Sequence, residues 1–450
     1  MKFSQIRRIT QATVLSLAIG LGMSACSEDY TIDYLYVTSQ HALPSTSDGA
    51  VNAYKVDNQS GALTQIVDSP YDSGGLAPVA IALSPNSQAL YVLNNQSSNS
   101  AIEEFLIGTD GKIYPQFGYS IGNNSATDGF APISAVVDPT NSFLIVAFTY
   151  QHNFSTSVPG PGGIAVFPIA NGSNPLCPVV ANSPGQAKNT LCAPIQVAGF
   201  PYTALSLSPV AVGVTPNPSN CPLSGGTVTT SCPSNGGDYV PSIYVVEQTV
   251  STLAAPTSTA GTVATYQLSL TTGQLSFVSS TAAGIAPTGI AEDPTARFVY
   301  LTDENANQII GYLVQPNGSL SLMVNAPFPA GLHPEGIVAD PRGKFIYVAN
   351  YNNSTVNGYA IDQATGTPAG VASNGVSATG TGPTCVAIEP SQGIYLYTSN
   401  FVDNSVSGLQ LDPHTGTLQN IQNTPFNASA QPTCAVAVAS GAHAFEALPQ

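Results

Sequence analysis

The sequence predicts an all-β fold, a seven-bladed β-propeller closed by its own C-terminal strand. Three observations lead to that prediction: the composition, a repeat along the chain, and the way the first and last repeats complement each other. Charged residues make up only 8% of the 450 residues, while Gly (41) and Pro (36) are abundant. A chain with few charges, many turn residues and many β-branched residues favours short strands over helices.

A unit of four short strands recurs along the chain, with the spacing that is typical of propeller blades. Its second strand is an apolar run that often contains tyrosine, as in LYVLN, FVYLTD and FIYVAN. Copies of this strand begin near residues 34, 90, 143, 243, 298, 345 and 394. Copies of the third strand begin near residues 51, 101, 163, 262, 308, 355 and 405. Both strands therefore indicate the same number of blades.

The two ends of the chain predict how the ring closes. The N-terminal copy of the repeat begins almost directly at its second strand and lacks a first strand. Residues 432–438 form a first strand that is not followed by the other strands of a repeat. That last stretch, PTCAVAV, matches PTCVAI at 383–388 in the last full repeat. We therefore expect residues 433–438 to pair with residues 34–39, which removes the free sheet edges that promote aggregation.

The domain boundaries follow from this pattern. We assign residues 1–25 to a signal peptide, 26–33 to a short tether, 34–440 to the propeller and 441–450 to a tail. The third and fourth repeats contain more residues than the others, and the additional residues are rich in Pro, Cys and Gly. We therefore expect loop insertions near 171–200 and 215–241. We place the first strand of the fourth blade at 201–206.

The N-terminal segment predicts export. A basic start precedes a short apolar stretch at 12–22, which is too short to span a bilayer. The sequence MSAC at 23–26 resembles a bacterial lipobox, which implies cleavage before Cys26 and lipidation of that residue. Because Ser27 rather than Asp follows, we expect an anchor in the outer membrane, on a side that the sequence leaves open. The alternative is an ordinary signal peptide cut near Ala25.

Export permits disulfides, and four cysteines bracket the two insertions. Cys177 and Cys192 lie in the first insertion, and Cys221 and Cys232 lie in the second. Local pairing within each insertion is the simplest connectivity.

Two further cysteines, Cys385 and Cys434, occupy equivalent positions on the first strands of adjacent blades. We expect this spacing to be too wide for a bridge and both residues to be buried free thiols. The cysteine and histidine spacings do not indicate zinc, so we expect no cofactor. Ca²⁺ held by acidic loops is the alternative.

The formal net charge is −16. An acidic surface repels phosphate backbones, which argues against nucleic acid as a partner and keeps an exported protein soluble. We expect a monomer that contacts the membrane through its anchor. A glycan, a peptide or an envelope protein is the expected ligand if the chain is a binding module.

Propellers usually bind ligands on the face that carries their second-to-third and fourth-to-first loops, called here the mouth face. The second strands end there in a ring of residues: Ser39, Asn94, Phe148, Glu247, Asp303, Asn350 and Asn400. From this ring, Ser39, Asn94, Asn350 and Asn400 are candidate binding residues.

Four residues at the mouth are candidate catalytic groups: Glu247 and Asp303 from the ring, and His333 and Glu335 at the start of the sixth blade. Paired carboxylates can work as acid and base, and histidine is a general base near neutral pH. The alternative for the acids and the amides is that they cap strands, as Asn and Asp do at turns.

Four basic residues of the propeller are predicted to lie away from the mouth face. Arg297, Arg342 and Lys344 lie at or beside first-to-second turns, and Lys112 lies in a third-to-fourth turn, all on the opposite face. A phosphorylated substrate needs an Arg or Lys clamp, so this distribution argues against a phosphosugar.

The repeated strands LYVLN, FIYVAN and IYLYTSN, each followed by an Asn-rich loop, resemble the YVTN-type propellers and the bacterial 6-phosphogluconolactonase-like family. The resemblance covers residues 30–440 and implies a propeller fold and opening of a lactone ring. Lactonases carry His and Arg near the channel, whereas the matching stretches at 131–138 and 201–206 have neither, and only His333-Pro334-Glu335 keeps a histidine.

Two functions stay open from the sequence. One is an envelope-anchored binding or scaffold module of this family. The other is a lactonase that opens an uncharged lactone.

Overall fold

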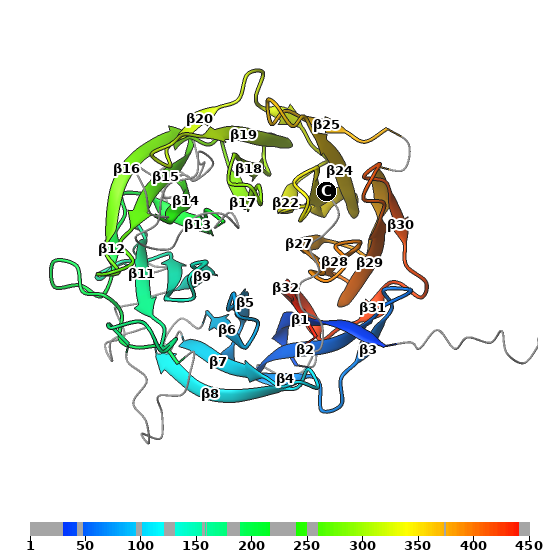
Figure 1. Ribbon diagram of the computed structural model, residues 1–450, viewed down its shortest axis with the longest axis horizontal. Coiled ribbons are helices and arrows are strands. Elements are labelled where there is room, and N and C mark those ends of the chain that lie inside the picture. Colours follow the sequence, from blue (N-terminus) through cyan, green and yellow to red (C-terminus); the bar gives the residue numbers. More distant parts are fainter. Residues whose placement is uncertain are drawn as a thin grey trace, which may run out of the picture.

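The computed structural model folds into seven antiparallel sheets around a central axis, one sheet per blade (Figure 1). This confirms the predicted fold class and blade number. The structure describes residues 30–42, 48–95, 101–120, 131–154, 158, 160–177, 190–216, 240–249, 260–372 and 375–440. The expected signal peptide, Cys26, Cys221, Cys232 and the expected tail lie outside these residues. Within them, no helix is long and apolar enough to cross a membrane.

The strands fall into four sets by their position in the blades (Figure 1). The innermost strands surround the axis: β5 (Pro78–Leu83), β9 (Pro132–Val137), β13 (Ser208–Val214), β17 (Pro287–Glu292), β22 (Pro334–Ala339), β27 (Pro383–Ile388) and β32 (Ala430–Ala439). The second strands are β1 (Thr31–His41), β6 (Ala89–Asn94), β10 (Phe143–Phe148), β14 (Ser242–Gln248), β18 (Phe298–Asp303), β23 (Phe345–Asn350) and β28 (Tyr395–Asn400).

The third strands are β2 (Asp48–Asp57), β7 (Ala101–Ile107), β11 (Gly163–Pro168), β15 (Gly261–Leu268), β19 (Gln308–Val314), β24 (Thr355–Ile361) and β29 (Ser405–Leu411). The outer strands are β3 (Leu63–Gln65), β4 (Tyr71–Leu76), β8 (Ile113–Ser120), β12 (Thr203–Ala204), β16 (Leu275–Ala282), β20 (Leu320–Leu322), β21 (Phe328–Pro329), β25 (Pro368–Gly370), β26 (Val376–Ala378), β30 (Leu418–Asn420) and β31 (Phe426–Asn427). A single 3₁₀ turn is described, η1 (Tyr351–Asn353).

The second strands are apolar over most of their length because each faces two cores. In β10 all six residues are buried. Phe143, Ile145 and Ala147 pack in the core shared with the fourth blade. Leu144 and Phe148 pack in the core shared with the second blade. The two-residue alternation of a strand therefore divides one apolar run between the two neighbouring sheets.

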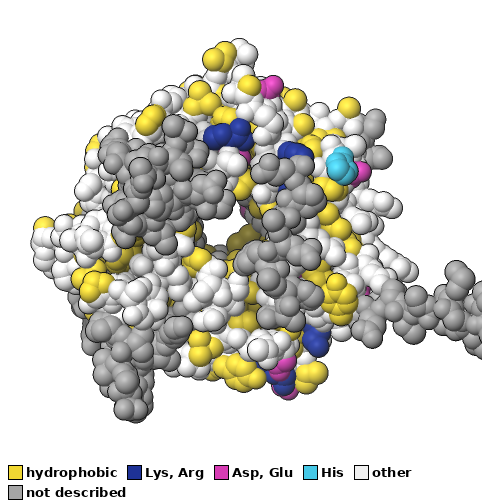
Figure 2. Space-filling model, in the orientation of Figure 1, with side chains coloured by type: hydrophobic (Ala, Val, Ile, Leu, Met, Phe, Trp, Pro, Cys, Tyr) yellow, Lys and Arg dark blue, Asp and Glu magenta, His cyan; other side chains and the backbone are white. Residues whose placement is uncertain are grey.

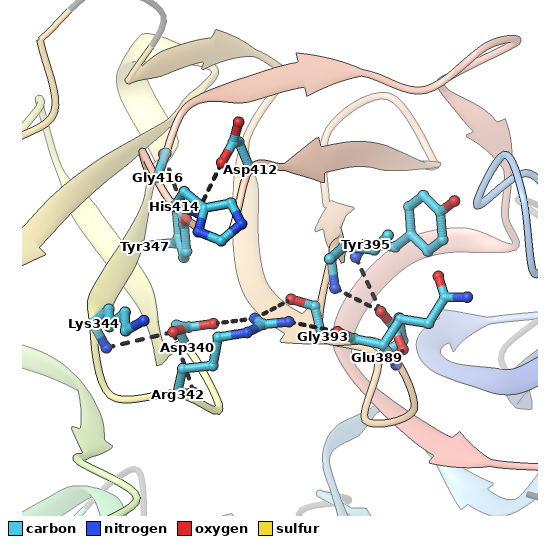
Figure 3. Close-up of polar contacts among 12 residues, drawn as sticks. Asp340, Arg342, Lys344, Tyr347, Glu389, Gly393, Tyr395, Asp412, His414 and Gly416 are labelled. Carbon is cyan, nitrogen blue, oxygen red and sulfur yellow. Dashed lines mark hydrogen bonds and ion pairs between the residues drawn. The ribbon is translucent and has the colours of Figure 1, made fainter. Parts of the chain in front are cut away.

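Tyrosines of five of the second strands bond their blade to the next one. The hydroxyl of Tyr300 donates to the carbonyl of Gly366 in the following blade at 2.6 Å, and that of Tyr397 donates to Gly61 at 2.7 Å. The same bond joins Tyr347 to Gly416 at 3.4 Å (Figure 3). Equivalent pairs are Tyr36–Gly111 and Tyr244–Gly318. These bonds satisfy buried hydroxyls and set the spacing between blades.

The C-terminal strand closes the ring as predicted. β32 pairs antiparallel with β1, with Tyr34 opposite Val438 and Val37 opposite Ala435. The first blade therefore takes its innermost strand from the end of the chain, and its β1, β2 and β3 from the beginning.

The free-thiol prediction for Cys385 and Cys434 is wrong, because the two residues form a disulfide with Cα atoms 5.0 Å apart. They lie on β27 and β32, the innermost strands of adjacent blades, and innermost strands converge toward the axis. This convergence brings equivalent positions within bridging distance.

The structure also places the segments around the insertions. The predicted Cys177–Cys192 disulfide is confirmed, with Cα atoms 5.7 Å apart. The prediction of the first strand of the fourth blade at 201–206 is wrong. Thr203 and Ala204 form the outer strand of the third blade, and β13 begins at Ser208. A long segment precedes β12, so the outer strand of the third blade comes later in the sequence than the repeat spacing predicts. The prediction therefore assigned this strand to the fourth blade.

Hydrogen bonds and ion pairs join neighbouring blades on the face opposite the mouth. Arg342 is 5% exposed at its side chain and pairs with Asp340 at 2.9 Å. Its guanidinium also donates to the carbonyls of Gln392 and Gly393 in the seventh blade at 2.7 and 2.9 Å (Figure 3). This arginine therefore joins two blades and is not available to a ligand.

Two carboxyl groups meet where the last blade joins the first. Asp33 in β1 and Glu389 after β27 are both fully buried. Ser391 Oγ donates to Asp33 Oδ1 at 2.6 Å, and the amides of Ile394 and Tyr395 donate to Glu389 (Figure 3). Burial, followed by a hydrogen bond to Glu389, raises the pKa of Asp33 to about 8. Asp33 therefore keeps its proton at neutral pH.

Gly366→Ala tests the contact between blades. Gly366 has φ +76°, and an added Cβ would lie 2.5 Å from Phe298 Cδ1. We expect the free energy of unfolding to fall by about 2–4 kcal/mol, because both the backbone and the packing are strained. Urea unfolding measures this change. Gly370→Ala is the matched control, since an added Cβ there meets nothing within 4 Å. Equal losses in the two variants would contradict the role given to Gly366.

Asp33→Asn tests the proton held by Asp33. The pKa of Asp33 is above its ordinary value of 3.8, so the folded chain keeps a proton that the unfolded chain releases. The stability contributed by this proton is fully present below about pH 4 and is lost as pH rises to 8, by up to about 1.4 kcal/mol per pH unit. Asn cannot titrate, so the variant should lose less stability than the wild type in urea unfolding between pH 5 and 8.

Asp362→Asn is the control for this experiment. Hydrogen bonds from Thr365 hold the pKa of Asp362 below its ordinary value, so Asp362 does not titrate between pH 5 and 8. Its variant should follow the wild-type pH dependence. An Asp33→Asn curve that runs parallel to the wild type would contradict the raised pKa of Asp33.

Candidate functional site

The predicted ring at the ends of the second strands is buried. Its seven residues are at most 4% exposed: Ser39, Asn94, Phe148, Glu247, Asp303, Asn350 and Asn400. Polar side chains this deep need hydrogen-bond partners inside the protein.

Most of the candidate binding residues of the ring form hydrogen bonds with neighbouring residues. Asn94 accepts from Ser73 Oγ at 2.9 Å and donates to the Ser73 carbonyl at 2.8 Å. Asn400 Nδ2 donates to the hydroxyls of Ser405 and Ser407, each at 2.9 Å. Ser39 accepts from Asn52 at 2.9 Å. These contacts are the ones expected of strand caps.

Asn350 departs from this pattern. Its Nδ2 donates to the Val348 carbonyl and to Thr355 Oγ1, each at the long distance of 3.3 Å. Its Oδ1 is buried with no hydrogen-bond partner among the described residues. Asn350 is therefore less firmly bonded than Asn94 and Asn400.

The two ring carboxylates also hold local structure. Asp303 accepts from the amides of Ile285 at 2.7 Å and Ala306 at 3.1 Å. Glu247 accepts from Thr262 Oγ1 at 3.1 Å, and burial raises the pKa of its carboxyl. The carboxylates within ion-pair distance of His333 are instead those of Glu304 and Glu335.

Glu304, His333 and Glu335 form an acid–histidine cluster at the mouth face. His333 Nε2 lies 3.4 Å from Glu304 Oε2 and 3.4 Å from Glu335 Oε1. Between 25% and 31% of each side chain is exposed. Unlike the buried ring, these three groups reach solvent and are open to a ligand.

Two adjacent blades build this cluster. Glu304 directly follows β18 of the fifth blade, whereas His333 precedes β22 of the sixth and Glu335 lies in it. Asn307 Oδ1 accepts from the His333 amide at 2.7 Å, and the His333 carbonyl accepts from the Tyr351 amide at 2.9 Å. These bonds hold His333 at φ +55°, a backbone conformation that only a few per cent of non-glycine residues adopt.

Burial, with a smaller effect from the nearby Glu304 carboxylate, raises the pKa of Glu335 to about 8. Glu335 therefore keeps its proton at neutral pH, beside an imidazole that can accept one. A carboxylic acid and a base at one exposed position can support general acid–base chemistry.

Sequence reasoning placed His333 and Glu335 at the mouth but missed Glu304. The sequence contains a signal for Glu304, because this residue directly follows the ring residue Asp303 and so belongs to a second-to-third loop at the mouth face. One residue further along the chain, the side chain leaves the buried strand end and turns toward the next blade.

Three of the described basic residues are engaged away from this cluster. Arg297 pairs with Asp293 at 3.2 Å, Lys112 pairs with Asp68 at 2.6 Å, and Arg342 joins the sixth and seventh blades. All three lie at turns of the opposite face.

Figure 2 shows a hollow at the centre of the ring, with apolar side chains on part of its wall. Across the described ranges, no group of three or more His, Cys, Asp or Glu side chains is arranged to hold a metal ion.

Comparisons with solved structures find the same fold. A periplasmic gluconolactonase of Pseudomonas aeruginosa, PpgL, superposes with a TM-score of 0.64 at 16% identity, covering 91% of this chain and 100% of that one. A putative 6-phosphogluconolactonase of Bacteroides uniformis gives 0.60 at 15% identity, with coverages of 91% and 100%. A comparison with curated proteins finds no match.

A family model described as "Lactonase, 7-bladed beta-propeller" matches residues 34–189 and 248–386. The match spans most of the propeller, from β1 in the first blade to β27 in the seventh. The chain therefore belongs to the seven-bladed β-propeller lactonase family.

Proposed function

We propose that this chain is a lactone hydrolase that opens an uncharged lactone at the Glu304–His333–Glu335 cluster. The observation that carries the proposal is the 3.4 Å approach of the Glu335 carboxyl to the His333 imidazole, both partly exposed at the mouth face, together with the burial that raises the pKa of Glu335 to about 8. Membership of the lactonase family and the fold shared with a gluconolactonase support the same reaction class.

The cluster supplies the proton transfers that the reaction needs. Water attacks the lactone carbonyl carbon while His333, paired with Glu304, accepts the proton of the water. The bond between the carbonyl carbon and the ring oxygen then breaks, and Glu335 gives its proton to the departing oxygen. His333 returns the proton to Glu335, and the hydroxy acid leaves. Each transfer between positioned groups contributes a factor of about 10²–10⁴.

An uncharged substrate fits the electrostatics. The Glu304 carboxylate repels a phosphate, and the described arginines are engaged on the opposite face. A phosphorylated lactone needs a cationic clamp of the kind that Arg and Lys provide. The binding or scaffold role that the sequence left open has less support, since a docking surface requires neither a bound proton nor a base.

We also propose that the mature chain is exported and anchored to the outer membrane through lipid on Cys26. The lipobox-like MSAC supports the anchor. The two disulfides among the described residues are typical of proteins that mature outside the cytosol.

Glu335→Gln and His333→Asn test the reaction. Each should lower kcat for δ-gluconolactone by about 10²–10⁴-fold, measured by release of acid after subtraction of the spontaneous rate. Glu247→Gln is the matched control, because Glu247 is buried and bonded to Thr262, and its kcat should stay near the wild-type value. Full turnover in both cluster variants would reject this site.

The pH dependence provides a second readout. The proposal requires protonated Glu335, whose pKa is about 8. The wild-type kcat should therefore be level just below pH 8 and fall about tenfold per pH unit above it. In Glu335→Gln the residual rate should not show this fall. A wild-type rate that rises through pH 8 after background subtraction would contradict the acid role of Glu335.

Cys26→Ser tests the anchor. The variant should lose incorporation of labelled fatty acid and move from the membrane fraction to the soluble fraction, because one modified cysteine carries all the lipid. Ser27→Ala is the control and should stay in the membrane fraction. Membrane retention of Cys26→Ser would rule out this anchor.

A further inference from the structure

Apolar side chains are exposed beside the acid–histidine cluster. Leu332, the residue before His333, is 53% exposed, and Val402, in the loop after β28, is also 53% exposed. The ring of Tyr351 lies 5.6 Å from that of His333 and is partly exposed. We call Leu332, Tyr351 and Val402 the apolar rim.

Contacts within the loops join these three residues into one surface. A Cβ added at Gly382 would lie 2.7 Å from Val402 Cγ2 and 3.0 Å from Tyr351 Cε2, so both side chains lie against the same glycine. The Leu332 amide donates to Asn353 Oδ1 in the turn that begins at Tyr351. The rim therefore continues from His333 across the mouth face toward the seventh blade.

Backbone bonds hold the rim in place. The Val402 amide donates to the Thr381 carbonyl at 3.2 Å, and the Phe401 amide donates to the Gly382 carbonyl at 2.8 Å. The Tyr351 amide is bonded to the His333 carbonyl at 2.9 Å. A ligand therefore meets apolar groups that are already in place, which lowers the entropic cost of binding.

We propose that the apolar rim binds an alkyl or other apolar substituent of the lactone whose ring is opened at the cluster. This inference rests on the proposed function and names its substrate class: an uncharged lactone with an apolar side chain, rather than a polyhydroxylated sugar lactone. The acids lie 3.4 Å from the imidazole of His333, and the rim adjoins that residue through Leu332 and Tyr351, so a polar and an apolar surface meet at His333.

The test is a series of γ-lactones of increasing chain length: γ-butyrolactone, γ-hexalactone and γ-octalactone, with δ-gluconolactone as the polar comparison. Each methylene that the rim covers should raise kcat/KM by about two- to fourfold. The wild-type ratio of kcat/KM for γ-octalactone to that for γ-butyrolactone should therefore exceed about tenfold.

Leu332→Ser combined with Val402→Ser should lower this ratio at least about threefold, because the covering surface is lost. Val324→Ser is the matched control: Val324 is 79% exposed and lies between β20 and β21, away from the rim. It should keep the wild-type ratio. All three side chains are largely exposed, so the substitutions do not disturb a core.

The outcomes separate the two proposals. Turnover that does not change with chain length, or a ratio that the double variant leaves intact, would overturn the inference and leave the hydrolase standing. Faster turnover of δ-gluconolactone than of γ-octalactone would also overturn it. Failure to open any of the four lactones would remove the proposed function itself and the inference with it.

Discussion

The pairing of β32 with β1 is the constraint on which the rest of the structure depends. Seven twisted sheets make a stable ring only when the last blade meets the first, and here one sheet takes strands from both ends of the chain. The Cys385–Cys434 disulfide joins β32 to β27 on its other side, so the closing strand is bonded to two blades. Closure gives β1 a paired strand on its inner side, so the first blade has an innermost strand like the other six.

The ring decides which loops share a face, and this places the candidate site. Glu304 belongs to the fifth blade and Glu335 to the sixth, yet both lie 3.4 Å from the imidazole of His333. The tyrosine–glycine bonds between blades, such as Tyr300 to Gly366, fix the spacing that makes this meeting possible. The site is thus a product of the contact between two blades.

Two adjacent acids illustrate how position decides role. Asp303 ends β18, is fully buried and accepts backbone amides, so its carboxylate stabilises the loops around it. Glu304 lies one residue further, where the strand has ended, and remains partly exposed beside His333. Burying a carboxylate requires donors around it, and those donors leave it no capacity for a ligand. The exposed acid retains that capacity.

The sequence by itself determined the all-β class, the seven repeats, the closing strand and the mouth position of His333 and Glu335, because these depend on local periodicity and on order along the chain. Only the tertiary structure decided that Cys385 reaches Cys434 and that Glu304 completes the cluster. Both depend on distances between neighbouring blades. Those distances follow from the convergence of strands around a common axis, which no local pattern of residues records.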